Sequence, residues 1–146
     1  MMARMKSILS GTDERRVIEA IRAAESRTSG EIRVHLERRC GGHPMDAALR
    51  WFTRLGMQQT RERNGVLFYV AVDERVFAVV GDRGIHDKVG EGFWNALRDD
   101  LQAAFAAGHH ADGLVRAIEI AGERLEQHFP RSADDRNELT DEVSSS

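Results

Sequence analysis

Apolar residues change their spacing several times along the chain, and each change marks a predicted element. Over 12–27 they recur with the 3.6-residue period of a helix, which Ser10 can cap at its start. The segment 31–38, EIRVHLER, alternates apolar and polar residues as a half-buried strand does. Pro44 suits the first turn of a further helix, which ends near Gly56.

The second half of the chain predicts a hairpin followed by two helices. GVLFYVAV at 65–72 is almost wholly apolar, as expected of a strand covered on both faces. A short turn at 73–75 leads into VFAVVG at 76–81, an antiparallel partner. Helical spacing returns from Lys88, in one helix that Gly108 breaks, and then over 111–129 in another.

The order of these elements is α-β-α-β-β-α-α, which predicts a small α/β fold. A parallel β-α-β pair and an antiparallel hairpin strand form a mixed sheet, and helices flank the sheet because its faces must be covered. We expect a single domain at 1–130. The remaining segment, 131–146, has two Arg against five acidic residues and no apolar periodicity, so we expect an acidic flexible tail.

Composition narrows the classes of function. The formal net charge of −3 equals that of the tail, so the body is neutral and lacks the basic surface of nucleic-acid binders. The longest apolar run, at 66–72, is far shorter than the roughly 20 residues that span a bilayer, and the segment MMARMKSILSG at 1–11 lacks the apolar region expected of a secretory signal. A single cysteine, Cys40, gives no sign of an oxidising compartment. We expect a cytoplasmic protein without direct membrane insertion or nucleic-acid binding.

The predicted topology brings polar residues to one edge of the sheet. If the first two strands are parallel, Glu31 and Asn64 stand where they begin. The third strand runs the other way and delivers Asp82 to the same edge, with Arg63 and Arg83 close by. Carboxylate and amide oxygens suit calcium or magnesium, so Glu31, Asn64 and Asp82 form a candidate metal site. Two carboxylates leave most of the ligands to water.

The segment VVGDRGIHDKVG at 79–90 admits other interpretations. It matches neither GxxxxGK[ST] nor GxGxxG, the loops that cradle phosphates. It contains the GxxG of KH domains, but that loop joins two helices, whereas here a strand precedes it. The simplest interpretation is a tight turn made by Gly81 and Gly84 and capped by Asp82. The turn and the cation site both stay open.

The other candidate metal and catalytic sites have weaker support in the sequence. His109 and His110 with Asp112 could bind a transition metal, but adjacent helical residues point about 100° apart. Cys40 and His43 supply two ligands where zinc needs three or four. No Ser, His and Asp arrangement indicates a nucleophile.

Five motifs, in this order and spacing, resemble the TPM domain family. They are TSGEIRV (28–34), RNGVLFYVA (63–71), VVGDRGI (79–85), FWNALRDDLQAAF (93–105) and ADGLVRAIEIAGERLEQHFP (111–130). The family includes thylakoid-lumen proteins of photosystem II repair and many bacterial proteins. The resemblance implies a small α/β sheet flanked by helices. It also implies divalent-cation binding near the strand ends in some members and acid phosphatase activity in some plant members.

The match to the family's motif residues falls on Glu31, Asn64 and Asp82. The chain departs from exported members at GDRGI, where they often show a GYGLE-like segment. It looks like the short cytoplasmic bacterial subtype that is often encoded beside a LemA-type membrane protein, which makes such a protein the expected partner.

Two functional hypotheses follow. The preferred one is a non-enzymatic protein-interaction or auxiliary module, with a calcium or magnesium ion at the sheet edge as a structural aid. The alternative is a metal-assisted acid phosphatase acting on phosphomonoesters, in which Arg63 and Arg83 bind the phosphate oxygens. No nucleophile or general base is identifiable for it.

Overall fold

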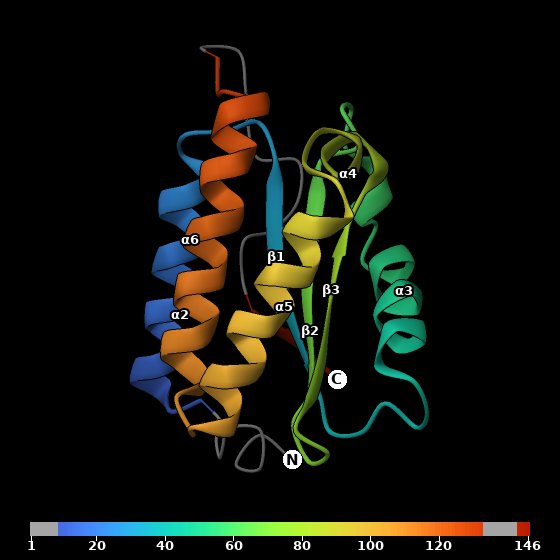
Figure 1. Cartoon of the computed structure of the whole chain (residues 1–146), viewed down its shortest axis with the longest axis vertical. Coiled ribbons are helices and arrows are strands. Elements are labelled where there is room, and N and C mark those ends of the chain that lie inside the picture. Colours follow the sequence, from blue (N-terminus) through green and yellow to red (C-terminus); the bar gives the residue numbers. More distant parts are fainter. Residues whose placement is uncertain (1–8, 133–142) are drawn as a thin grey trace.

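A computed structural model describes residues 9–132 and 143–146. A mixed sheet stands between two layers of helices (Figure 1). The helical elements are α2 (Gly11–Glu25), α3 (Pro44–Arg54), the 3-10 turn η1 (Met57–Gln59), α4 (Arg83–Val89), α5 (Glu91–Ala106) and α6 (His110–His128). The strands are β1 (Glu31–Glu37), β2 (Gly65–Ala71), β3 (Val76–Gly81) and β4 (Ser144–Ser145).

The sheet has the strand order β3-β2-β1-β4. Strands β1 and β2 are parallel, with Glu31 opposite Gly65, and the hairpin pairs β2 with β3 so that Val66 faces Gly81. The predicted mixed α/β fold, with a parallel β-α-β pair and an antiparallel hairpin strand, is therefore confirmed. The starts of β1 and β2 and the end of β3 share one edge, as the topology argument expected.

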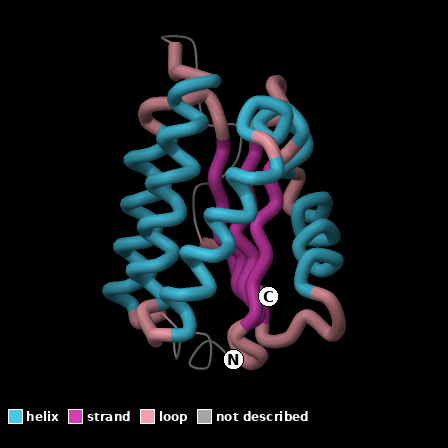
Figure 2. The backbone as a smooth tube through the Cα atoms, viewed as in Figure 1, coloured by secondary structure: helices cyan, strands magenta, loops and turns pink. Residues whose placement is uncertain are grey.

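Helices cover the two faces of the sheet unequally. Helices α2, α5 and α6 pack on one face, and α3 alone covers the other (Figures 1 and 2). Strand β2 is buried along its whole length, as predicted. The prediction of a half-buried β1 was wrong, because α3 covers the face on which its polar residues lie, and His35 is only 1% exposed.

The observed elements differ from the predicted order over 83–106 and near the C-terminus. The helix expected from Lys88 is two helices, because α4 begins at Arg83 and Gly90, with φ +78°, separates it from α5. Strand β4 lies within the segment predicted to be a flexible tail and pairs with β1. Most of that prediction concerns residues 133–142, which lie outside the described residues.

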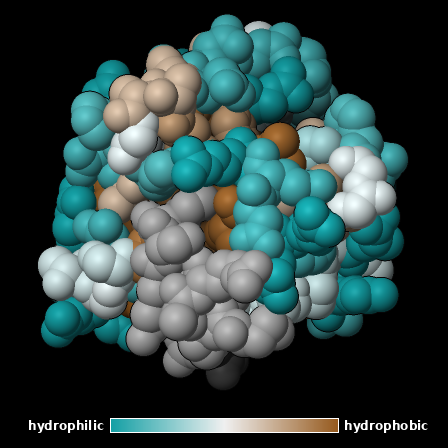
Figure 3. Space-filling model, turned by 90° about the horizontal axis from the view of Figure 1, so that it is seen from below, coloured by the Kyte–Doolittle hydropathy of each residue, from teal (hydrophilic) through white to brown (hydrophobic). Residues whose placement is uncertain are grey.

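Among the coloured residues in the view from below in Figure 3, hydrophilic ones cover most of the surface, a moderately hydrophobic group lies near the rim, and strongly hydrophobic residues show between their neighbours. Leu49 is the one large hydrophobic residue of the described chain that is exposed, at 49%. Over the same residues, no helix is long and apolar enough to cross a membrane.

Candidate functional site

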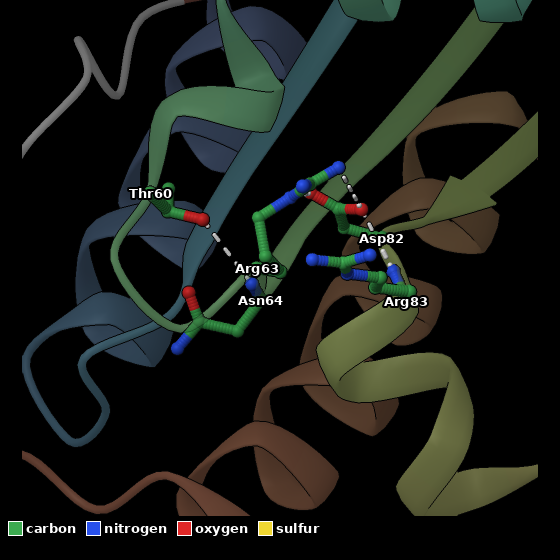
Figure 4. A network of polar contacts seen from close by, with 5 residues as sticks. All are labelled: Thr60, Arg63, Asn64, Asp82 and Arg83. Carbon is green, nitrogen blue, oxygen red and sulfur yellow. Dashed lines mark hydrogen bonds and ion pairs between the residues drawn. The ribbon is translucent and has the colours of Figure 1, made fainter.

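A paired acid and base occupy the edge where the three strands meet (Figure 4). The guanidinium of Arg63 makes two hydrogen bonds to the carboxylate of Asp82, from Nε to Oδ2 at 2.8 Å and from Nη2 to Oδ1 at 3.1 Å. Such a two-point contact fits the planar fork of an arginine to a carboxylate. The contact raises the pKa of Arg63, which keeps its charge in any case.

Asp82 is also the N-cap of α4. Its Oδ1 accepts the backbone N–H of Arg83 at 2.7 Å, so Arg83 meets Asp82 through its main chain. The backbone N–H of Asp82 donates to the carbonyl of Gly65 at 2.9 Å, which ties the cap to β2. Asp82 thus joins a helix start, a strand end and the loop that carries Arg63, and is only 7% exposed.

Both glycines of the GDRG segment are required by close packing. A Cβ on Gly81 would lie 2.2 Å from the ring of Trp94. One on Gly84 would lie 2.1 Å from the carbonyl oxygen of Glu62, because the 62–63 loop packs directly against the start of α4. Arg63, at the tip of that loop, has φ +52°. The segment that raised the question of phosphate or RNA binding has, in this structure, the hydrogen bonds of a capped turn.

The other two candidate ligands lie at the same edge. Asn64 donates two hydrogen bonds. Its backbone N–H donates to Thr60 Oγ1 at 3.2 Å (Figure 4), and its Nδ2 donates to Ser29 Oγ at 3.2 Å. Its buried Oδ1 has no hydrogen-bond partner in the described part of the chain. Glu31 is 2% exposed, and its backbone N–H donates to the carbonyl of Asn64 at 3.4 Å.

These residues fit a hard cation poorly as they stand. Arg63 neutralises the charge of the Asp82 carboxylate, and both oxygens of that carboxylate already accept hydrogen bonds. Within 9–132 and 143–146, no three His, Cys, Asp or Glu side chains gather in a way that could hold a metal ion. A cation would have to displace Arg63 before it could use Asp82. Calcium or magnesium binding at Glu31, Asn64 and Asp82 stays a prediction.

The phosphate-binding role predicted for Arg63 and Arg83 also stays a prediction. An anion at this edge would compete with Asp82 for the guanidinium of Arg63. Arg83 lies on the first turn of α4 with an exposed side chain, but the nearby carboxylate opposes a phosphate there.

A second polar cluster was not foreseen from the sequence. The His35 ring stacks on Trp51, with ring centroids 4.0 Å apart, and its two nitrogens contact Ser144 and Ser146. Trp51 Nε1 donates to Glu37 at 2.9 Å, which also accepts the hydroxyl of Tyr69 at 3.2 Å. The alternation in 31–38 placed His35 on a polar face, and only the covering helix and β4 reveal that this face is buried.

A third feature is the outer edge of β3. Among the described residues no strand pairs with it. Two hollows of about 150 Å³ and about 300 Å³ lie beside it. Residues of β3 line both, and so does Arg98 of α5. The other walls come from Met45 and Trp94 in the first hollow and from Pro44 in the second.

Three other residues that the sequence singled out as possible ligands, His43, Cys40 and Asp112, have structural partners. His43 caps α3, because its Nδ1 accepts the N–H of Met45 at 3.2 Å. Cys40 is buried, which raises the pKa of its thiol, and its Sγ donates to the carbonyl of Gly42 at 3.0 Å. Asp112 pairs with Arg16 at 2.6 Å.

These features define a small α/β domain whose mixed sheet carries a salt-bridged turn at one edge. A model of the TPM domain matches residues 3–124, and the chain belongs to that family. No curated protein matches the chain.

Solved structures agree with this assignment. The chain is similar to the BA42 protein from the psychrophilic bacterium Bizionia argentinensis, with 43% identity over 94% of this chain and 95% of that one and a TM-score of 0.87. The N-terminal domain of a protein from P. gingivalis shares the fold, with 21% identity, 86% and 83% coverage and a TM-score of 0.67. The N-terminal domain of the cg2496 protein from Corynebacterium glutamicum also shares the fold. Its identity is 15%, over 90% of this chain and 83% of that one, and its TM-score is 0.60.

Proposed function

We propose that the chain is a protein-interaction module that takes an extended segment of a partner along the outer edge of β3. The observation that carries this proposal is that, within the described part of the chain, no strand pairs with the outer edge of β3, and the strand has no Lys, Pro or bulge. Exposed sheet edges are normally blunted by Lys, Pro or a bulge. VFAVVG at 76–81 contains neither residue, and its pairing with β2 runs without a break from Val76 to Gly81.

The hollows beside this edge provide side-chain pockets. An added strand gains affinity from main-chain hydrogen bonds and specificity from pockets for alternate side chains. Their linings combine apolar side chains, such as Val79 and Phe77, with the charged side chains of Arg98 and Asp99. A segment that alternates apolar and charged residues fits this arrangement.

The resemblance stated above suggests the partner, a LemA-type membrane protein, and the cytoplasmic face of the membrane as the location. The domain would then bind a soluble segment of that protein without entering the bilayer. The binding role is preferred to the phosphatase alternative because Asp82 already engages the guanidinium of Arg63, which the phosphatase would need for its phosphate.

A divalent cation would serve as a structural aid in this function. The buried Oδ1 of Asn64 supports it, since this oxygen accepts no hydrogen bond from the described residues and an amide oxygen suits a hard cation. The proposal requires Arg63 to release Asp82.

The test is a titration of the isotope-labelled chain with the soluble part of a purified LemA-type protein, followed by backbone amide NMR. We expect the largest shifts at 76–81 and in the neighbouring turns of α3 and α5. Arg98→Glu should weaken binding about fivefold or more, because Arg98 lines both hollows. Arg116→Glu, the same charge reversal on the exposed side of α6, should leave it unchanged. Shifts elsewhere, or equal affinities in the two variants, would exclude the β3 edge.

A further inference from the structure

On the side of the sheet away from β3, the outer edge of β1 already pairs with a short extended segment, β4. The contacts of this segment are specific. Strand β4 runs parallel to β1, with Ser144 opposite His35 and Ser145 opposite Leu36. The backbone N–H of Ser146 donates to the carbonyl of Leu36 at 3.1 Å. These bonds use the outer edge of β1 in the way that an added strand does.

Side chains make the distinctive contacts. Ser144 Oγ lies 2.8 Å from His35 Nδ1, and Ser146 Oγ lies 3.0 Å from His35 Nε2. Alternate residues of a strand point to the same face, so the His35 ring can contact the hydroxyls at positions i and i+2, while the side chain between them points away. Ser145, which lies between them, is exposed.

The ring is held in place for this contact. It stacks on Trp51, and the Tyr69 ring lies on the same face at 6.4 Å. Burial, and then the charge of Arg33, lowers the pKa of His35 to about 4. At neutral pH the ring therefore has one donor and one acceptor nitrogen, and a hydroxyl can serve either.

The resident segment uses only part of the edge. Among the described residues β4 pairs with His35 and Leu36, whereas β1 runs over seven residues from Glu31 to Glu37. The segment 133–142 connects it to the body. A longer strand could pair with β1 as far as Val34 and displace β4, whereas the backbone N–H of Ile32 already donates to Glu25 Oε2 at 2.7 Å.

We propose that the outer edge of β1, with His35, is a binding site for an extended peptide segment of another protein that carries Ser-x-Ser, and that Ser144–Ser146 occupies this site as an internal ligand. The site is on the opposite side of the sheet from β3, so it is independent of the function proposed above.

The test uses the full chain and two synthetic hexapeptides. One has the sequence of residues 141–146, Asp-Glu-Val-Ser-Ser-Ser, and the control has Ala in place of its first and third serines. Each is titrated into the isotope-labelled wild type, into the double variant Ser144→Ala with Ser146→Ala, and into Ser145→Ala. The readouts are the amide of Leu36 and the ring signals of His35.

The double variant should reach half-saturation at a peptide concentration at least tenfold lower than the wild type, because its internal ligand is weakened. Ser145→Ala should behave as the wild type. The control peptide should bind at least tenfold more weakly. If Leu36 and His35 signals do not move, if both peptides bind equally, or if the double variant needs as much peptide as the wild type, the contact is internal packing and the proposal is overturned.

A second copy of the chain could also supply the segment. Light scattering without peptide distinguishes this case. We expect a monomer. A dimer that the double variant abolishes would assign the site to strand exchange between copies and overturn the assignment to another protein.

Discussion

Arg63 and Asp82 form a two-point salt bridge, at 2.8 Å and 3.1 Å, that joins the loop before β2 to the start of α4. The carboxylate is 7% exposed, whereas the Arg63 side chain is 37% exposed. Water can therefore solvate the arginine if its partner is removed. Water reaches the buried carboxylate of Asp82 much less easily if Arg63 is removed. We conclude that this edge depends more on Asp82 than on Arg63.

The first prediction concerns this carboxylate. Asp82→Ala removes the cap of α4 and the partner of Arg63, and should lower the free energy of unfolding by about 1–3 kcal/mol. Arg83→Ala should change it by less than about 0.5 kcal/mol, because Arg83 meets Asp82 through its backbone. Urea denaturation of the three proteins measures both. Equal stabilities of Asp82→Ala and the wild type would contradict the proposed role.

The second prediction separates close packing from backbone freedom. Gly84→Ala should lower the free energy of unfolding by about 2 kcal/mol or more, because its Cβ would meet two backbone carbonyls, at 2.1 Å and 2.6 Å. Gly92→Ala is the matched control. A Cβ there meets nothing within 4 Å, and alanine favours the helix, so stability should stay equal or rise by up to about 1 kcal/mol. Thermal and urea denaturation both report the difference. A stable Gly84→Ala protein would show that the 62–63 loop can move away.

The arrangement of β1, β2 and β3 could be predicted from the sequence because it depends only on periodicity. An alternating segment, an apolar segment after the intervening helix, and a third segment after a three-residue turn sufficed to bring Glu31, Asn64 and Asp82 to one end of these strands. The pairing of Asp82 with Arg63 could not be predicted. It depends on the positive φ of Arg63 and on the approach of the loop to Gly84, neither of which leaves a periodic pattern.

The environment of His35 escaped prediction for a different reason. Alternating polarity shows which residues share a face of a strand, but not whether another element covers that face. Helix α3 covers it here, and a two-residue strand too short to leave a pattern closes its edge. The boundary between α4 and α5 was missed because the apolar spacing continues across Gly90.

The third prediction follows from the pKa of His35. Burial and Arg33 lower it to about 4 in the folded chain, from 6.5. Between these values the unfolded chain binds a proton that the folded chain does not, so stability falls as pH decreases from about 6.5 to about 4. Above this window the residue has no effect. The full loss attributable to His35 is about 3 kcal/mol.

The measurement is the free energy of unfolding against pH for the wild type, His35→Gln and His109→Gln. His35→Gln should be less sensitive to pH over the window, whatever its absolute stability. His109→Gln is the control for replacing an exposed histidine, and the difference between the two variants isolates the contribution of His35. Parallel curves for the wild type and His35→Gln would refute the assignment.

The last prediction tests the cation at the sheet edge, where calcium must compete with Arg63 for Asp82. A ligand that prefers the folded state raises the melting temperature. Millimolar calcium should therefore raise it more in Arg63→Gln than in the wild type, because the competing guanidinium is gone. The rise should disappear when Asp82→Asn and Glu31→Gln are added to that variant. Scanning calorimetry with calcium and with a chelator makes the comparison. If calcium leaves the melting temperature of Arg63→Gln unchanged, the oxygens at this edge do not bind it, and Asp82 acts only as the cap of α4 and the partner of Arg63.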